Sequence, residues 1–410
     1  MHVLYFHQHF TTPDGAGGTR SYEFARALVA RGHRVTMVCG QSATGGLKLP
    51  WDAKARWHRG DVEGIHVIAL PLTYSNRTGL AQRAWVFLRY AWRSVGLALR
   101  QDYDLLFATS TPLTAALPGI AMKVLRRGKP FVFEVRDLWP ELPRALGMKN
   151  PVLLGGMSVL EWLGYRTADA CIALAPGIAD GIRHRAPRDR RVVTIPNGCD
   201  LDLFTPEKRR TPLNLAGIEP GDFVAGFTGA HGIANGLDAV LDAAAELQRR
   251  GRTDIKLVLI GDGNQKDRLV ARAKTEGLSN CLFFPPVKKT EIARITASFD
   301  CGLQILADVP AFYRGTSPNK FFDYISSGIP VLNNYPGWLA ELIQTHGCGI
   351  VTPRKDATAL ADALCALADN PERCRVKGEA ARRLAIEQFR RSELARQFVE
   401  QLERTAAGGR

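Results

Sequence analysis

Short runs of apolar residues alternate along this chain with longer stretches in which apolar residues recur every three or four positions. Unbroken apolar runs are typical of strands buried on both faces of a parallel sheet, and the longer spacing is typical of amphipathic helices. The first half predicts helices such as 19–31 and 151–165 between its strands. Its apolar runs predict strands over 2–6, 34–39, 65–70, 105–109, 130–135 and 170–174.

The pattern restarts after a basic segment that contains proline, over 184–191. Strands that alternate with helices indicate an α/β fold with doubly wound parallel sheets. We therefore predict two Rossmann-like domains with a hinge over 180–192, followed by a long amphipathic helix or helix pair over 378–405. The strands expected in the second half are 192–195, 223–228, 256–260, 282–284, 301–303, 330–332 and 349–351.

The composition is that of a globular protein. A chain of 410 residues is long enough for two domains, each with its own core, and 46% of it is hydrophobic. No apolar run is long enough to span a bilayer, and the N-terminus lacks the pattern of a secretory signal. The eight cysteines are scattered without metal-binding spacing, so we expect reduced thiols in a cytoplasmic protein.

The net charge of +14 is concentrated in the first half, where 25 Lys and Arg stand against 14 Asp and Glu. The segment 77–100 has five arginines and no acidic residue, and aromatic residues lie between them. One interpretation is a helix that lies on an anionic membrane, and the other is a helix that packs its aromatics on the sheet. We favour the membrane. We exclude nucleic acid, because no helix-turn-helix, RRM or zinc-finger pattern accompanies the charge.

The most informative segment is 317–331, which predicts a helix with charged groups in its first turn. Ser317 suits the N-cap and Pro318 the first helical position, so free N–H groups and Lys320 form a site for an anion. Asp323 lies one turn further on. A cation for phosphate and a carboxylate for a diol suit a nucleotide; the alternative is a surface helix with an ordinary Lys–Asp pair.

Two glycine-rich loops follow predicted strands. Gly17 and Gly18 allow close approach of the backbone to a ligand, although a flexible loop is the alternative. This loop lacks GxGxxG spacing, and no acidic residue ends the second strand, so a dinucleotide-binding dehydrogenase is disfavoured. In the second loop, Gly229 and Gly232 are expected to hold a diphosphate. His231 either contacts the ligand there or is incidental.

Charged and polar residues stand at other strand ends, which face the ligand crevice in an open α/β sheet. Glu134, Arg136 and Asp137 form such a cluster; the alternative is that Asp137 caps the next helix, with Arg136 as its structural partner. The turn at Gly263 ends another strand. The backbone of 286–288 follows the next one and is expected to read a base edge.

The ordered set of motifs resembles the retaining GT-B glycosyltransferases of family 4. Within that family, the chain is similar to the bacterial fucosyl- and N-acetylfucosaminyl-type transferases of O-antigen and exopolysaccharide assembly. The resemblance covers nearly the whole chain and rests on Gly17-Gly18 with 30–35, and on 134–141, 195–200, 228–238, 261–263 and above all 317–331.

The resemblance implies two Rossmann-like domains that face a central cleft. The region 1–185 would bind the acceptor, 186–385 would bind the nucleotide sugar, and a helix in 386–410 would cross back to the first domain. It also implies transfer with retention, by front-face attack assisted by the leaving phosphate, with no metal and no other cofactor. UDP is expected over GDP by the same resemblance.

The chain departs from the broad family pattern of two glutamates eight residues apart. Asp323 stands at the second of these positions and Gly315 at the first. Ala230 and Asn235 lie near the places of the usual Arg and Lys of the second glycine-rich loop. Lys320 is then the main candidate to neutralise the diphosphate. Arg136 stands in place of the familiar acceptor-side histidine.

These considerations assign every expected site residue. The catalytic set is Glu134, Arg136, Asp137 and Lys320; the donor-binding set is Gly229, His231, Gly232, Gly263, Val287, Lys288, Ser317, Pro318, Asn319, Lys320 and Asp323; the acceptor and sugar side is Gly17, Gly18 and Arg20, with no metal ligand.

The expected reaction moves a sugar, of hexosyl or N-acetylhexosaminyl type, from a UDP-sugar to a polyprenyl-diphosphate-linked saccharide. The protein would lie at the inner face of a bacterial membrane, with 77–100 on the anionic surface. Two alternatives stay open: a nucleotide-sugar 2-epimerase on the same architecture, and a non-catalytic protein that binds a sugar nucleotide.

Overall fold

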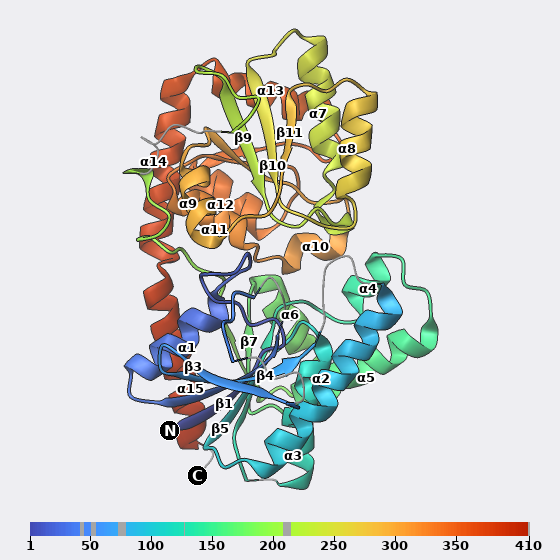
Figure 1. The fold of residues 1–410 in the computed structure, drawn as a ribbon, viewed down its shortest axis with the longest axis vertical. Helices are drawn as coiled ribbons and strands as arrows, with labels where there is room; N and C mark the ends of the chain where they lie inside the picture. Colours follow the sequence, from blue (N-terminus) through green and yellow to red (C-terminus); the bar gives the residue numbers. More distant parts are fainter. Residues whose placement is uncertain (42–44, 51–54, 73–78, 127, 208–214, 409–410) are drawn as a thin grey trace. The chain divides into compact units, whose positions relative to one another are not determined.

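The computed structural model describes residues 1–41, 45–50, 55–72, 79–126, 128–207 and 215–408. They form two compact units, each with a parallel sheet between helices (Figure 1). Unit 1 comprises Met1–Pro196, Arg314–Ser317 and Ser392–Arg410, and unit 2 comprises Asn197–Tyr313 and Pro318–Arg391. The predicted α/β class with two Rossmann-like domains is confirmed.

The sheet of unit 1 has the order β3-β4-β2-β1-β5-β6-β7-β8. The neighbouring pairs from β4 to β8 are parallel, and β3, which the apolar pattern did not predict, runs antiparallel to β4 at the edge. Its strands are β1 (His2–Phe6), β2 (Arg34–Gln41), β3 (His58–Val62), β4 (Ile65–Pro71), β5 (Leu105–Thr109), β6 (Phe131–Val135), β7 (Ala170–Ala173) and β8 (Arg191–Thr194).

One expected strand lies in the other sheet. The segment 192–195 was assigned to the second half, but β8 pairs with β7, as in Ala170 opposite Arg191. The basic segment before it does not separate the sheets, because α6 (Pro176–Arg185) simply carries the chain from β7 to β8, the next parallel strand. The chain therefore leaves unit 1 only after Pro196.

The helices of unit 1 begin with local signals that the sequence contains. Asn150 caps α5, and its side chain accepts the N–H groups of Val152 and Leu153, while Pro151 occupies the first helical position. The helices are α1 (Arg20–Ala30), α2 (Leu80–Arg100), η1 (Leu113–Ala116), α3 (Leu117–Leu125), α4 (Glu141–Ala145), α5 (Pro151–Thr167), α6 (Pro176–Arg185) and, at the end of the chain, α15 (Arg391–Gly408).

Helix α15 belongs to the core of unit 1, far from it in sequence. The Phe398 ring lies 4.6 Å from the ring of Phe24 and 5.0 Å from that of Phe107, measured between centroids. Leu394 and Leu402 are buried in the same cluster. Burial of one such side chain is worth about 1.5–3 kcal/mol, so the contacts hold α15 firmly on the sheet.

Unit 2 has a parallel sheet in the order β11-β10-β9-β12-β13-β14. The order reverses beside β9, the first strand, and such a switch point is where open α/β sheets bind ligands. The strands are β9 (Phe223–Thr228), β10 (Ile255–Ile260), β11 (Cys281–Phe284), β12 (Cys301–Gln304), β13 (Val331–Asn333) and β14 (Gly349–Val351).

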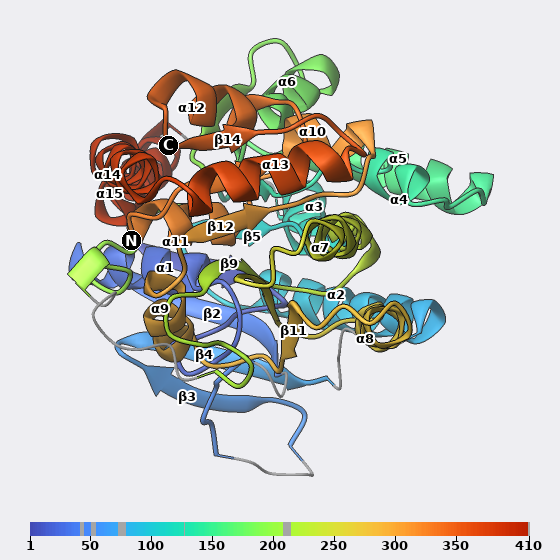
Figure 2. The same cartoon turned by 90° about the horizontal axis from the view of Figure 1, so that it is seen from above.

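The helices of unit 2 cover both faces of this sheet (Figure 2). Asp356 caps α13 and Asn370 caps α14, each through a side-chain oxygen that accepts a backbone N–H. The helices of unit 2 are η3 (Ile233–Asn235), α7 (Asp238–Arg249), α8 (Lys266–Thr275), α9 (Lys289–Ala297), α11 (Asn319–Ser326), α12 (Trp338–His346), α13 (Ala357–Ala368) and α14 (Pro371–Gln388), and α10 (Pro310–Gly315) begins in unit 2 and ends in the segment assigned to unit 1.

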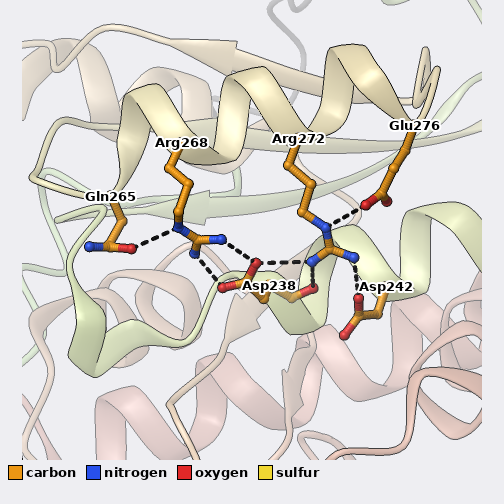
Figure 3. A network of polar contacts seen from close by, with 6 residues as sticks. All are labelled: Asp238, Asp242, Gln265, Arg268, Arg272 and Glu276. Atoms are coloured by element: carbon orange, nitrogen blue, oxygen red, sulfur yellow. Dashed lines mark hydrogen bonds and ion pairs between the residues drawn. The ribbon is translucent and has the colours of Figure 1, made fainter.

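A polar network joins α7 and α8 (Figure 3). Arg268 and Arg272 of α8 both bind the carboxylate of Asp238, at the start of α7. Arg272 also binds Asp242 and Glu276. These pairs lie near solvent, where ion pairs stabilise little, so we read the network as a surface link between two helices and not as a ligand site.

Candidate functional site

At the carboxyl end of the unit 2 sheet, the loops after β9 and β10 are joined through their backbones. The N–H of Gly229 donates to the carbonyl of Ile260 at 3.0 Å, and the N–H of His231 donates to that of Asp262 at 3.0 Å. A Cβ on Gly261, whose φ is +151°, would meet the Gly229 oxygen at 1.8 Å. Only glycine fits there, which leaves a surface of backbone groups at the switch point.

The loop after β11 is tied to the same surface. The ammonium group of Lys266 donates to the carbonyl of Gly261 at 2.7 Å and to that of Phe284 at 2.8 Å. The N–H of Gly261 in turn donates to Phe284. One lysine therefore satisfies two carbonyl groups and fixes the ends of two strands.

Lys320 of α11 lies over the Gly229 loop. Its Nζ donates to Oδ1 of Asn235 at 2.8 Å and lies 3.9 Å from the centroid of the Phe227 ring. A Cβ built on Gly229 would be 3.5 Å from the Lys320 Cε. Burial lowers the pKa of Lys320 to about 7. Within the part of the chain that the structure describes, no carboxylate pairs with this ammonium group, which suits it to an anionic ligand.

The start of α11 differs from the prediction. The helix begins at Asn319, and Pro318, with φ −74° and ψ 131°, occupies the cap position in place of Ser317. No side chain caps this helix end, because proline has no polar side chain. The backbone N–H groups of Asn319 and Lys320 thus lie in an uncapped first turn, while that of Phe321 donates to the Pro318 carbonyl. Gly328, with φ +66°, ends the helix as expected.

The ordinary Lys–Asp pair is absent from the described structure, since Lys320 binds Asn235 and not Asp323. The half-buried carboxyl group of Asp323 has a pKa raised to about 7, mainly by burial and further by Asp200. Lys289 and Arg391 oppose that shift, but both cations already bind Asp200. Asp323 therefore has acceptor capacity left for a hydroxyl pair.

The His231 side chain does not face a ligand, which corrects the donor-binding assignment of its ring. The ring is fully buried between Phe227 and Phe283, with centroids 6.0 and 6.1 Å away. Burial lowers its pKa to about 4, so the ring is neutral. Gly263 packs on the His231 backbone, where a Cβ would lie 2.5 Å from the carbonyl oxygen. The neutral His231 ring therefore packs in the interior and helps to shape the loop.

The other expected donor residues lie around this edge. Gly232 directly precedes η3 in the β9 loop. Val287 is half-buried, and exposed Lys288 occupies the cap position of α9, after β11. The unit boundary falls between Ser317 and Pro318. The roles of these residues toward a nucleotide stay predictions.

At the carboxyl end of the unit 1 sheet, Arg20 and Glu134 form a fully buried ion pair. Arg20 donates from Nε and Nη2 to Oε2 of Glu134, at 3.0 and 2.8 Å, and Thr109 donates to Oε1 at 2.7 Å. Arg20 also donates to the carbonyls of Ile195 and Pro196. With both side chains inaccessible to solvent, the catalytic role expected for Glu134 and the acceptor contact expected for Arg20 are corrected to positioning roles.

Arg136 and Asp137, in contrast, stand at the edge with separate partners. Nη1 of Arg136 lies 3.0 Å from Nε2 of His7, and its backbone N–H donates to Ser110 at 2.8 Å. Asp137 accepts a hydrogen bond from Thr111 at 3.0 Å, and burial raises the pKa of its carboxyl group. The two side chains are half-buried, so both are within reach of a substrate.

The structural alternative for Asp137 is wrong. The following helix, α4, has Pro140 at its cap position, and no side chain binds its free N–H groups. Asp137 also makes no ion pair with Arg136 among the described contacts. The carboxyl group of Asp137 is therefore not a helix cap. Its place at the carboxyl end of the sheet agrees with the predicted contact with a substrate.

Sequence reasoning missed two residues of this edge. His7 directly follows β1, and burial together with Arg136 lowers its pKa well below the usual value, so it is a neutral acceptor for Arg136. Thr111 follows β5 with φ +79°, a costly conformation for a β-branched residue that recurs at functional sites. Both stand directly after apolar runs, and that position was the available signal.

The glycines of the first loop lie beside α1. Gly17 is exposed and Gly18 half-buried, and a Cβ on Gly17 would meet the hydroxyl of Thr11 at 3.0 Å. Thr19 stands at the cap position of α1 without a side-chain bond to it. The acceptor contacts of Gly17 and Gly18 stay predictions.

The aromatic residues of the basic helix divide between core and solvent. Residues 77 and 78 of the predicted segment lie outside the described residues, and α2 begins at Leu80. The Tyr90 hydroxyl is buried and donates to Val38 at 2.7 Å, as the packing alternative expects. Trp85 and Trp92 are 66% and 82% exposed, which that alternative does not explain. No described helix is long and apolar enough to cross a membrane.

Comparison with known proteins identifies the family. Residues 15–198 match the glycosyl transferase 4-like domain, and residues 216–384 match the glycosyl transferases group 1. Together the two matches cover most of the chain. The chain therefore belongs to the glycosyltransferases that combine these two domains, and the GT-B fold expected from the resemblance is confirmed.

Three individual proteins that the chain resembles are 30% or less identical to it. The chain is 30% identical over 200 residues to a D-inositol 3-phosphate glycosyltransferase of Nocardia farcinica, a match that covers 47% of this chain and 43% of that protein. It superposes on sucrose-phosphate synthase from Thermosynechococcus elongatus with a TM-score of 0.78 at 18% identity, over 99% of both chains. Anabaena HepE, solved with UDP and glucose, gives 0.69 at 18% identity, over 98% of this chain and 99% of HepE.

Proposed function

We propose that the protein is a retaining glycosyltransferase that moves a sugar from UDP to a hydroxyl of a polyprenyl-diphosphate-linked saccharide. The observation that carries the proposal is Lys320, an ammonium group without a carboxylate partner in the described residues, held over the Gly229 loop at the switch point of unit 2. Family membership supports glycosyl transfer as the reaction.

In the proposed reaction, the bond between the anomeric carbon and the diphosphate oxygen breaks. A new bond forms from the same face to the acceptor oxygen, and the acceptor proton passes to the leaving phosphate. Lys320, the free N–H groups of α11 and the backbone of the Gly229 loop would stabilise the charge that develops on the diphosphate. Asp323 would accept hydrogen bonds from the ribose hydroxyls.

On the acceptor side, unit 1 would supply Arg136 and Asp137. Arg136, anchored by His7, suits a phosphate or a polar saccharide group. Asp137, oriented by Thr111, suits a sugar hydroxyl, from which its carboxylate can accept a hydrogen bond. Arg20 and Glu134 would hold β6 and the chain after β8 in place beneath them.

UDP is proposed over GDP because HepE, with the same fold, was solved with UDP and glucose. The sugar is proposed to be an N-acetylamino or deoxy hexose and the pathway O-antigen or exopolysaccharide assembly, both from the resemblance of the motifs. Exposed Trp85 and Trp92 beside exposed Arg89 support a peripheral place for α2 on the anionic inner face of a membrane.

The test compares Lys320→Ala with Lys320→Arg. Calorimetric titration with UDP and with GDP measures donor binding, and a product assay with a lipid-linked acceptor measures turnover. We expect Lys320→Ala to weaken UDP binding and to lower kcat/KM about 100-fold, and Lys320→Arg to recover part of the loss because it restores the charge. Normal kinetics in Lys320→Ala would contradict the proposal.

A second incubation separates transfer from epimerisation. With UDP-N-acetylglucosamine and no acceptor, a transferase leaves the sugar nucleotide unchanged or slowly hydrolysed. Conversion to its C2 epimer would instead establish the 2-epimerase alternative, and NMR of the anomeric proton distinguishes the two.

A further inference from the structure

Unit 1 carries a second group of exposed apolar side chains, apart from the tryptophans of α2. It lies on the α4–α5 hairpin, which we define as residues 141–167. Val152 is 80% exposed and Val159 58%, and Leu146, Leu153 and Trp162 are exposed as well. Large exposed apolar patches mark interaction surfaces in proteins that are otherwise well packed.

Three of these exposed side chains form one face of α5. Val152, Val159 and Trp162 are seven and three positions apart, so they lie along the same side of the helix, with exposed Gly155 and Gly156 between them. No charged residue interrupts this face before Arg166. Both cartoon views show the hairpin projecting from the rest of its unit (Figures 1 and 2).

Basic residues flank the apolar face. Arg144, in the last turn of α4, and Lys149, just before α5, are exposed, against one exposed acid, Glu141. At the other end, the Arg166 guanidinium lies 5.4 Å from the centroid of the Trp162 ring. An apolar face with cations at both ends complements a surface of anionic headgroups over an apolar interior.

The neighbouring helices extend the same chemistry. Helix α3 packs against both α2 and α5, and it exposes Val124 and Leu125 beside exposed Arg126. Helix α2 contributes Trp85 and Trp92 and contains no acidic residue. Exposed cations surround apolar groups on three separate helices. A single groove in a partner protein would not match this arrangement, whereas the anionic headgroups and apolar interior of a bilayer would.

We propose that the α4–α5 hairpin is a membrane-docking element that inserts Val152, Val159 and Trp162 below the headgroups of an anionic bilayer. This deepens the proposed function, on which it rests for the lipid-linked nature of the acceptor. In this proposal α5 inserts into the bilayer, whereas the sequence alone indicated only membrane contact through the basic helix α2.

A buried contact joins this element to the acceptor edge. Glu161 of α5 accepts the N–H of Trp139 at 3.0 Å and the hydroxyl of Tyr165 at 2.7 Å, and it pairs with Arg185. Trp139 is two residues from Asp137 along the same loop. A bilayer that holds α5 would thereby hold the Asp137 loop close to the membrane surface, where a lipid-linked acceptor lies.

The test uses the full-length protein and vesicles with equal parts of phosphatidylcholine and phosphatidylglycerol. The variant Val152→Ser/Val159→Ser is compared with the matched control Val376→Ser/Ile386→Ser, which removes two exposed apolar side chains from α14 in unit 2. We expect the hairpin variant to co-sediment with the vesicles at least tenfold more weakly than the wild type. The control variant should bind as strongly as the wild type. Equal binding of both variants would overturn the proposal.

Two readouts separate this proposal from the proposed function. UDP affinity should be equal in all of these variants, and its absence in the wild type would refute the donor role without touching the vesicle result. Brominated lipids should quench tryptophan fluorescence less in Trp162→Phe than in the wild type. If the hairpin instead mediates self-association, seen as a hairpin-dependent dimer by sedimentation without vesicle binding, the proposal is wrong.

Discussion

The two sheets end differently at their carboxyl edges. In unit 2, the edge consists mainly of backbone from interlocked loops, and Lys320 binds an amide oxygen and an aromatic ring there, with no carboxylate partner among the described residues. In unit 1, the edge is built from charged side chains, and its strongest pair, Arg20 with Glu134, is fully buried. A charged residue at a strand end can therefore either stabilise the fold or be available to a ligand, and its partner decides which of the two applies.

A buried cation with a carboxylate partner completes the fold, whereas a cation without one leaves room for a ligand. Arg20 has Glu134 and two carbonyl groups, which satisfy its donors internally. Lys320 carries the cost of burial in a pKa lowered to about 7, with no ion pair to offset it in the described residues. A diphosphate would supply that missing charge.

The largest expected effect tests the unit 1 half of this comparison. Glu134→Ala leaves the Arg20 guanidinium buried without its anion, so we expect the free energy of unfolding to fall by about 3–5 kcal/mol. Urea unfolding followed by circular dichroism measures this. Arg20→Met/Glu134→Leu removes both charges and should recover most of the loss; equal damage in the double variant would contradict the ion-pair explanation.

The pH profile tests the unit 2 half. In the proposed reaction, donor binding would need Lys320 protonated, below about pH 7, and Asp323 ionised, above about pH 7. We expect kcat/KM for the donor to form a bell with its maximum near pH 7 and about tenfold loss per unit on the outer limbs. Lys320→Arg should remove the alkaline limb and Asp323→Asn the acid limb; a profile unchanged in both variants would refute these assignments.

The same shifts predict the sign of the stability changes. The folded pKa of Lys320 is below its ordinary 10.5, so the unfolded chain binds the extra proton between about pH 7 and 10.5 and this group makes stability rise with pH there. The folded pKa of Asp323 is above its ordinary 3.8, so this group makes stability fall as pH rises from 3.8 to about 7. Comparing unfolding curves of each variant with the wild type isolates each slope.

A smaller effect is expected at the accessible part of the unit 1 edge. Asp137→Asn keeps the shape but removes the charge that would orient an acceptor hydroxyl, so we expect kcat to fall about 10- to 100-fold with UDP affinity unchanged. Thr111→Val, which removes only the hydrogen bond to Asp137, should cost less. Weakened UDP binding in either variant would place the residue on the donor side instead.

The smallest effect is expected at the surface network of Figure 3. Arg268→Ala removes a half-exposed pair with Asp238, so we expect a loss of unfolding free energy below about 1 kcal/mol and unchanged kinetics. Thermal melts at low and high salt measure this loss, which should shrink at high salt. A larger loss would mean that α7 and α8 depend on the network more than their exposure indicates.

The sequence alone determined the places of the strands. The predicted bounds of β1, β5, β9 and β14 agree with the structure, because each is a continuous apolar run between polar loops. The pattern failed for β3, His58–Val62, which has a mostly polar sequence and lies at the sheet edge, where only one face needs apolar residues. It also placed 192–195 correctly as a strand, but in the wrong sheet, because strand pairing is not encoded locally.

Only the tertiary structure decided which polar residues are sealed in ion pairs and which stay accessible. Glu134 and Asp137 are three residues apart and were indistinguishable in the sequence, yet one pairs with Arg20, over a hundred positions away, and the other does not. The same holds for His231, which chain neighbours and a second strand bury, and for the exposed face of α5. Apolar periodicity is a local property of the chain, whereas burial and ion pairing depend on contacts between residues far apart in it, which the sequence does not display.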